Sequence, residues 1–424
     1  MKPTIIVFSG IRGTSPVWGL SSLARAFERL GYRTVTMASD DPGIKEKIRT
    51  LVSEEDVRFI LSHNLKGWNI KYESGGKHHF FYDFFDKWLV SVIDTPLNKI
   101  DRIKHGGHKK ILLFPDGSFL PLVRKVAPNG TVSEHLPMWV VDDCLVDAAT
   151  EHSRKDVGAR KIDVLWVGRV GANTAFVRRK ANIIKSIATR SVLKKALYCQ
   201  DKQIHDIFMG VQNRQWFLRH IAPFSAPYSA ESLHFLWGLS NLVRARRRMG
   251  VLEELASLPT TVRLIVVSNN PEGISKMFKS NVELLPFQEW PKVVELMQDA
   301  KIVVNVQPFH IYGSHERLMT AMAHGAAVAT DRNPYLEEHF EDDHNLIFYE
   351  FKKGHLRAKL LEYLGDLGRL RCVAQQAAEK VLKEDLAIHR AQDIIALVGR
   401  VSSDEEGKPE TDKESEPEEN LACR

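Results

Sequence analysis

Two sets of short apolar segments, each alternating with helical patterns, constrain the fold of this chain more than any other feature. In the first half the segments are Thr4–Phe8, Thr34–Ala38, Val57–Ser62, Trp88–Ile93 and Lys110–Phe114. In the second half they are Asp163–Gly168, Val262–Val267, Val282–Leu285, Ile302–Val306, Ala326–Ala329 and Leu346–Tyr349. Because apolar runs separated by helices are typical of parallel strands covered on both faces, the sequence predicts an α/β protein with two doubly wound, Rossmann-like sheets.

The length of 424 residues also favours two domains, since most single domains are much shorter. We expect the first domain at residues 1–155 and the second at 160–384, followed by a closing helix at 385–400. The second domain contains a long helical and basic stretch at about 174–258, which includes Arg178–Lys180 and Arg244–Arg248. Such a charge run is equally consistent with a solvated helix face and with a contact to phosphate or acceptor.

The net charge of +6 is distributed unevenly along the chain. Residues 401–424 carry nine acidic side chains against three basic ones, which gives −6 and leaves +12 for the remainder. Since this tail has few large apolar residues, we expect it to be disordered. The basic remainder suits an anionic partner: a sugar nucleotide, a phosphorylated glycan, a membrane surface or nucleic acid.

Several classes of protein are disfavoured by what the sequence lacks. No apolar run approaches the roughly 18 residues that span a bilayer, and the first residues resemble a strand, not a signal peptide, so we expect a cytoplasmic protein. Four well-separated cysteines predict reduced thiols. The cluster His105–His108 lacks further ligands at metal-binding spacing, so no metal site is predicted. A P-loop motif is also missing.

The most informative segment runs from Asn305 to Asp331. A strand ending at Asn305 and Gln307 leads through a polar loop into a helix, for which Ser314 is the expected N-cap and Gly325 the expected C-cap. Ligands bind at the carboxyl ends of parallel strands, and helix N-termini there attract phosphate. The segment therefore predicts an anion-binding site.

Arg317 is the most informative residue of this segment, because a cation in the first helical turn opposes the helix dipole unless an anion binds there. Its guanidinium can clamp a diphosphate through two hydrogen bonds. Pairing with a carboxylate, such as Glu316 or Asp331, is an equally good explanation of the pattern.

Other candidates follow strands of the first domain. His63 and Asp94 each come after a predicted strand and should face the cleft, although Asp94 before Thr95–Pro96 is also well placed to cap a helix. Asp116 and His135 are further candidates.

The segment Asn305–Pro308, Gly313–Arg317 and Ala321–Asp331 resembles the donor-side signature of GT-B glycosyltransferases, the group 1 glycosyl transferases. It is most similar to the spore-maturation (CgeB-like) branch. Ile93–Leu97, Phe114–Gly117 and His135–Pro137 are similar to motifs of that branch's N-terminal domain. The likeness extends over most of residues 85–350.

The resemblance implies a GT-B fold and a metal-independent, hexosyltransferase-type enzyme with no cofactor, whose co-substrate is a UDP- or GDP-linked sugar. Catalytic candidates are His63, Asp94 and Glu316. The donor-binding residues it implies are Gly10, Gly13, Gly168, Arg169, Phe287, Asn305, Gln307, His315, Glu316 and Arg317. The acceptor would be a glycan, a lipid-linked or a macromolecular molecule.

One departure from the family pattern concerns the sugar. Many retaining members carry two glutamates eight positions apart, where this chain has Tyr312 and Thr320. Hydroxyl recognition by those glutamates therefore cannot be carried over. Two alternative functions stay open: a nucleotide-sugar epimerase or hydrolase on the same fold, and a non-catalytic protein that binds nucleic acid or a membrane through its basic helices.

Overall fold

The computed structural model describes residues 2–10, 18–38, 41–65, 87–104, 109–142, 144–145, 155–170, 230–279, 282–307 and 310–406. Several predictions lie outside these residues: those for Gly13, for His105–His108, for Arg178–Lys180 with most of the basic stretch, and for the tail beyond residue 406. No helix within the described ranges is long and apolar enough to cross a membrane.

The first sheet has six parallel strands in the order β2-β1-β3-β4-β5-β6. The strands are β1 (Thr4–Gly10), β2 (Arg33–Ala38), β3 (Val57–His63), β4 (Trp88–Val92), β5 (Lys110–Phe114) and β6 (Val132–His135). Its helices are α1 (Trp18–Arg29), α2 (Ile44–Glu54), α4 (Ile100–Lys104) and α5 (Leu120–Val126). Short 3-10 turns precede α4 at Pro96–Asn98 and α5 at Gly117–Phe119.

The second sheet also has six parallel strands, in the order β12-β11-β10-β7-β8-β9. They are β7 (Ile162–Gly168), β8 (Leu264–Ser268), β9 (Glu283–Leu285), β10 (Ala300–Val304), β11 (Ala327–Asp331) and β12 (Ile347–Tyr349). The helices are α11 (Ala230–Ala256), α12 (Pro271–Ile274), α13 (Trp290–Gln298), α14 (Glu316–Ala323), α15 (Pro334–His339), α16 (His355–Gly365), α17 (Leu367–Glu384) and α18 (Ala387–Glu406). Two further 3-10 turns lie at Val157–Ala159 and Ser275–Met277.

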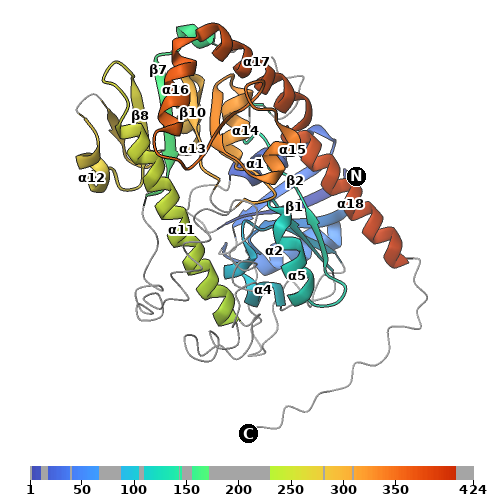
Figure 1. The fold of residues 1–424 in the computed structure, drawn as a ribbon. Coiled ribbons are helices and arrows are strands. Elements are labelled where there is room, and N and C mark those ends of the chain that lie inside the picture. Colours follow the sequence, from blue (N-terminus) through green and yellow to red (C-terminus); the bar gives the residue numbers. More distant parts are fainter. Residues whose placement is uncertain are drawn as a thin grey trace, which may run out of the picture.

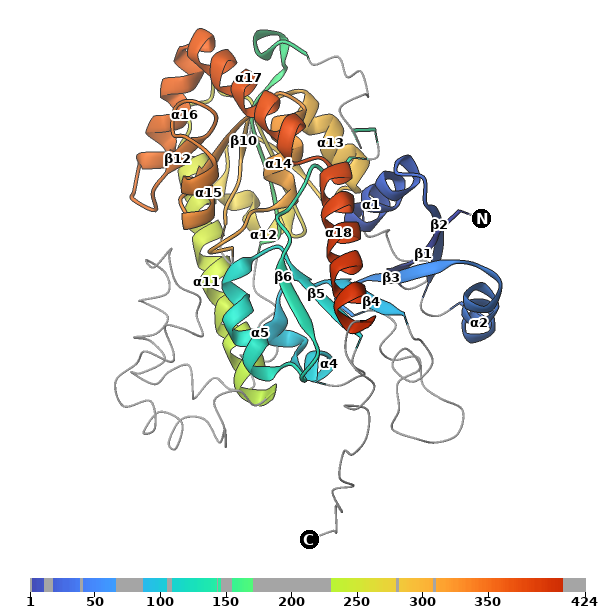
Figure 2. The ribbon, with the colours of Figure 1, turned by 90° about the vertical axis from the view of Figure 1, so that its right-hand side faces the viewer.

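Helices cover both faces of each sheet, so the central strands are buried, as the continuous apolar runs predict. The predicted fold class is confirmed. Two helices join the halves of the molecule (Figures 1 and 2). The N-terminal half of α11 packs in the core of the first sheet through Leu236 and Leu239, while Leu252 and Leu255 pack in that of the second. The last helix, α18, returns to the first sheet through Ala391 and Ile394.

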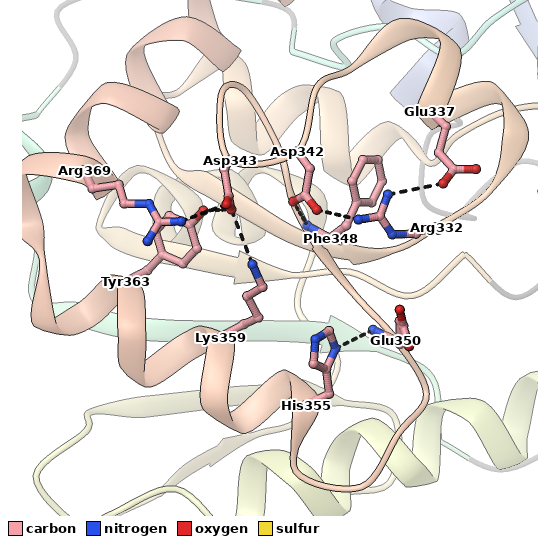
Figure 3. A network of polar contacts seen from close by, with 10 residues as sticks. All are labelled: Arg332, Glu337, Asp342, Asp343, Phe348, Glu350, His355, Lys359, Tyr363 and Arg369. Carbon is pink, nitrogen blue, oxygen red and sulfur yellow. Dashed lines mark hydrogen bonds and ion pairs between the residues drawn. The ribbon is translucent and has the colours of Figure 1, made fainter.

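The edge of the second sheet is held by polar contacts around the loop that follows α15 (Figure 3). Asp343 accepts a hydrogen bond from Tyr363 and pairs with Lys359 and Arg369. Arg369 also lies over the Tyr363 ring, 4.5 Å from its centroid. These contacts fix α16 and α17 against the strands they cover.

The structure departs from the predictions at three places. Strand β6 was not predicted, because its four residues are too short and too polar for an apolar run. Helix α18 continues to Glu406, so residues 401–406 are helical and not part of a disordered tail. The Leu233–Val243 part of α11 packs mainly with the first sheet, although the sequence assigned it to the second domain. The proposed domain boundary near 155–160 itself stays a prediction.

Candidate functional site

The carboxyl ends of the two sheets meet at Asp116, which follows β5. Its carboxylate accepts hydrogen bonds from the backbone N–H groups of Ile311 and Tyr312, each 3.0 Å long. The N–H of Gly117 donates to the carbonyl of Tyr312 at 2.8 Å. A Cβ on Gly313 would lie 2.0 Å from the carbonyl oxygen of Pro115, so only glycine fits there. Asp116 therefore holds the loop before α14.

His135, the other additional candidate, is also part of this packing. Its ring lies 5.5 Å from that of Tyr312 and 5.7 Å from that of Tyr335, between centroids. Burial lowers the pKa of His135, so the ring is neutral at pH 7. These contacts place it among aromatic side chains at the junction of the two sheets.

Helix α14 begins one residue later than predicted. His315, in extended conformation, is the N-cap, whereas Ser314 is buried before it with an unpartnered hydroxyl. The expected C-terminal glycine is confirmed, since Gly325 has a φ of 74°. Arg317 lies in the first turn, and among the described side chains no carboxylate forms an ion pair with it.

Four arginines converge near this turn: Arg169 after β7, Arg244 and Arg248 on α11, and Arg317 on α14. Arg248 is only 6% exposed, and its Nη1 donates to the carbonyl oxygen of Arg169 at 3.1 Å. Burial and the neighbouring arginines hold the pKa of Arg248 well below its usual value. The same causes lower the pKa of Arg244 to about 10. Because Arg248 is buried beside other cations, an anion bound at this cluster would offset the cost of burying its charge.

Two histidines lie beside the cluster, His310 buried and His315 partly buried, with ring centroids 4.4 Å apart. Burial lowers the pKa of His310 to about 4 and that of His315 to about 3, so both are neutral at pH 7. Although burial favours the protonated form of Glu316, the contact with His315, whose Nδ1 lies 3.7 Å from Oε2 of Glu316, and the charge of Arg317 hold its pKa well below the usual value. The contact with His315 is the larger of these two effects, and Arg248 is a second nearby cation that interacts with Glu316.

His63 and Asp94 are brought together by the pairing of β3 with β4. His63 Nε2 lies 2.9 Å from Asp94 Oδ1, and Asn64 Nδ2 donates to Asp94 Oδ2 at 2.9 Å. Asn64 is in the left-handed region at φ 55°, which turns its amide back toward Asp94. The side chain of Asp94 is 60% exposed and open to solvent.

Glu316, which belongs to the second sheet's half of the molecule, interacts electrostatically with Asp94, and its negative charge acts to raise the pKa of Asp94. Partial desolvation of this exposed carboxylate acts to raise its pKa, but the charge and hydrogen bond of His63 and the hydrogen bond from Asn64 outweigh that effect and lower the pKa of Asp94. The predicted cap at Asp94 is not formed, since Thr95 is the residue that begins the next turn. The three catalytic candidates thus lie within one electrostatic neighbourhood.

Buried polar atoms without partners mark the strand ends of the second sheet. Gln307 is 1% exposed, yet neither its amide oxygen nor its amide nitrogen has a partner. Asn305 Oδ1 and Asp331 Oδ2 are unpartnered as well, although Asp331 Oδ1 accepts a hydrogen bond of 2.6 Å from the Gln307 N–H. Such atoms are rare in folded proteins, and each calls for an explanation, such as a functional role or an ordered water or ion.

The remaining donor-binding candidates follow other strands of the same sheet. Gly168 ends β7, and a Cβ there would lie 2.7 Å from the Trp166 ring. Phe287 follows β9 and is 58% exposed, an unusual position for so large an apolar side chain. Gly10 ends β1 at the carboxyl edge of the first sheet. No set of three or more His, Cys, Asp or Glu side chains arranged to hold a metal occurs in the described ranges.

Thr320, which stands where the family pattern has a glutamate, is fully buried. Its Oγ1 accepts a hydrogen bond of 3.0 Å from the N–H of Val141. At the other position of the pattern, Tyr312 donates through its hydroxyl to Glu338 at 2.6 Å. Both residues are therefore engaged in contacts within the protein and do not replace the two glutamates.

Sequence reasoning missed Asn64 and His310, and it treated Arg244 and Arg248 only as part of a basic run. The spacing of four residues between the two arginines places them on one helix face and is the signal that could have identified them. No sequence signal marks Asn64 or His310.

Residues 247–396 match the model of a family described as glycosyl transferase-like. No curated protein matches the sequence significantly. Solved structures match along almost the whole chain. Sucrose-phosphate synthase from Thermosynechococcus elongatus superposes with a TM-score of 0.54 and 9% identity, covering 95% of this chain and 100% of its own.

HepE from Anabaena, in complex with UDP and glucose, has a TM-score of 0.52 at 10% identity and covers 94% of this chain and 100% of its own. An α-glucosyltransferase in complex with UDP-glucose and DNA has a TM-score of 0.55 at 8% identity, covering 94% and 99%. Together with the two parallel sheets, these likenesses show that the chain has the GT-B fold of glycosyltransferases, with a glycosyl transferase-like segment at 247–396.

Proposed function

We propose that this protein is a glycosyltransferase that moves a sugar from a nucleoside diphosphate sugar to a glycan, lipid-linked or macromolecular acceptor. The observation that carries the proposal is the arginine cluster at the start of α14, where Arg248 is buried and Arg317 has no carboxylate partner among the described side chains. A diphosphate supplies the negative charge that such a cluster requires. The N–H groups of the first turn of α14 add further donors.

The strand order supports an extended pose for the donor. Phe287 follows the edge strand β9, Arg169 follows β7 and Asn305 follows β10, which pairs directly with β7. We place the nucleobase against the exposed ring of Phe287, the diphosphate among Arg169, Arg244 and Arg317, and the sugar toward Glu316. Gly168 lets the backbone approach the phosphates, and Gly10 borders the sugar from the first sheet.

The proposed reaction breaks the bond between the anomeric carbon and the diphosphate oxygen, which keeps the electron pair. Arginine side chains stabilise the negative charge that develops on this leaving group, a task that needs no metal ion. A hydroxyl of the acceptor forms the new bond to the anomeric carbon, and His63 takes its proton while Asp94 orients the imidazole ring. Ionised Glu316 stabilises the positive charge that develops on the sugar.

UDP-sugars are the first donors to test, because the structures of HepE and of the α-glucosyltransferase contain UDP or UDP-glucose. The latter structure also contains DNA, so nucleic acid is included among the macromolecular acceptors. Membership of the spore-maturation branch, a cytoplasmic location and peripheral membrane contact through basic helices are further parts of this proposal.

The test is product analysis with purified protein and a panel of UDP- and GDP-sugars, with and without oligosaccharide, lipid-linked and DNA acceptors. A transferase releases the nucleoside diphosphate and attaches the sugar to the acceptor. Arg317→Ala should abolish release, whereas Arg332→Ala, which removes an arginine paired with Asp342 outside the site, should not. Complete conversion of the donor to an isomer without acceptor would identify an epimerase instead. Salt-sensitive polyanion binding without nucleotide affinity would identify a binding protein.

A further inference from the structure

A cavity of about 650 Å³ lies between α11 and the segment that joins β12 to α16, outside the site described above. Its size falls in the range of about 300–1,000 Å³ that is usual for small-molecule sites. Val251 and Leu356 are buried in its walls, and Phe351 lines it. Figure 3 shows the loop that carries Glu350 and leads to His355, the first residue of α16.

Gly250 contributes to this cavity from within α11. A glycine in a helix interior weakens the helix, so its presence calls for a reason. A Cβ at Gly250 would meet no atom within 4 Å, so no close approach of a neighbour explains it. The missing side chain instead leaves room in the cavity.

The cavity also has a flat cationic wall and a basic rim. Arg247 is 5% exposed, and its guanidinium lies 5.2 Å from the centroid of the Phe351 ring. Arg246 and Lys353 are exposed at the rim. Three carboxylates also line the cavity: Glu254 accepts hydrogen bonds from two N–H groups at the start of α16, Glu350 pairs with Lys352, and Glu253 is exposed.

We propose that this cavity is a second ligand site, which binds a phosphate monoester that carries an aromatic group. The ring lies against Phe351 and the guanidinium of Arg247, and the phosphate is held by Arg246 and Lys353. Positions 246 and 250 lie on the side of α11 opposite to Arg244 and Arg248, because two residues turn a helix by about 200°. The phosphate end of the site therefore faces away from those two arginines, while Tyr349 of the cavity lining donates a hydrogen bond to the carbonyl oxygen of Asn305, and Arg247 acts electrostatically on Asp331.

Calorimetric titration of the full chain with phenyl phosphate tests the proposal. Saturating UDP occupies the donor site during the titration, and a parallel titration of the Arg317→Ala variant removes any dependence on that site. We expect binding in both cases. Gly250→Leu should weaken it at least tenfold by filling the cavity. Gly399→Leu is the matched control, since Gly399 lies within α18, has no atom within 4 Å of its Cβ position and is remote from the cavity.

Two comparisons test the two halves of the ligand. Phe351→Leu should weaken phenyl phosphate binding about tenfold, and inorganic phosphate should bind at least tenfold more weakly than phenyl phosphate. Thermal melting should show that Gly250→Leu is folded. The proposal is overturned if phenyl phosphate does not bind, if UDP displaces it, if a folded Gly250→Leu variant binds it as tightly as the wild type, or if inorganic phosphate binds equally well.

Discussion

Replacing Arg244 by methionine should stabilise the nucleotide-free protein and weaken its binding of UDP. Burial and the charges of Arg169 and Arg317 lower the pKa of Arg244 from 12.5 to about 10. At pH 7 this arginine is charged in both the folded and the unfolded chain, so the lowered pKa measures how strongly the folded state disfavours the charge. At about 1.4 kcal/mol per pH unit, this lowering of the pKa of Arg244 corresponds to a cost of about 3 kcal/mol for its charge in the folded state.

Methionine also loses the hydrogen bond of 2.6 Å from Arg244 Nη2 to Asn241 Oδ1, which contributes about 1 kcal/mol. We therefore expect the free energy of unfolding to rise by about 1–2 kcal/mol without nucleotide. The loss of one charge-assisted hydrogen bond to the diphosphate, about 1.5–3 kcal/mol, should raise the Kd of UDP about 10–150-fold.

Denaturant unfolding with and without UDP, combined with calorimetric titration, measures both quantities. Arg246→Met is the control, because Arg246 is exposed on the same helix and should change neither. A variant of Arg244 that is less stable than the wild type by about 1 kcal/mol or more, and that binds UDP equally well, would refute the anion-binding interpretation of the cluster.

Three further predictions concern the strand ends and the junction of the sheets. Burial raises the pKa of Asp331 from 3.8 to about 6, so ionisation of this carboxyl lowers the free energy of unfolding as the pH rises from about 4 to 6. Asp331→Asn should remove up to about 3 kcal/mol of this loss at pH 7.5 but little at pH 4, as measured by unfolding at both pH values. His63→Ala should lower kcat about 10²–10⁴-fold with UDP affinity unchanged, and a Kd that rises in parallel would show a binding role instead. Gly313→Ala should cost more than about 2 kcal/mol and weaken UDP binding, because its Cβ meets the Pro115 carbonyl; a wild-type melting curve would contradict this.

The positions of most strands along the chain were predictable from the sequence because buried parallel strands are short, continuous apolar runs. Strand β6 could not be recognised by that rule, since its Ser133 and Glu134 are polar. Residues that follow neighbouring parallel strands can also be expected to lie close together. His63 and Asp94 are an example, because β3 and β4 pair directly. Parallel strands of one sheet bring the residues after their carboxyl ends to the same edge.

Contacts between distant elements were not predictable in this way. Arg248 approaches Arg169 although the two are 79 positions apart in the sequence, and no local pattern specifies where α11 lies. The role of Thr320 likewise depends on Val141, a residue of another segment. Sequence spacing fixes the face of a helix on which a side chain lies, but tertiary packing decides what that face meets.

The central claim, that the start of α14 holds a nucleoside diphosphate, is tested most directly by titrating UDP and GDP into the wild type and into Arg317→Ala. We predict binding of at least one nucleotide to the wild type and a Kd about 100-fold higher or more for Arg317→Ala, with unchanged melting of the nucleotide-free proteins. Equal affinity of the two proteins, or no binding of either nucleotide to the wild type, would contradict the claim.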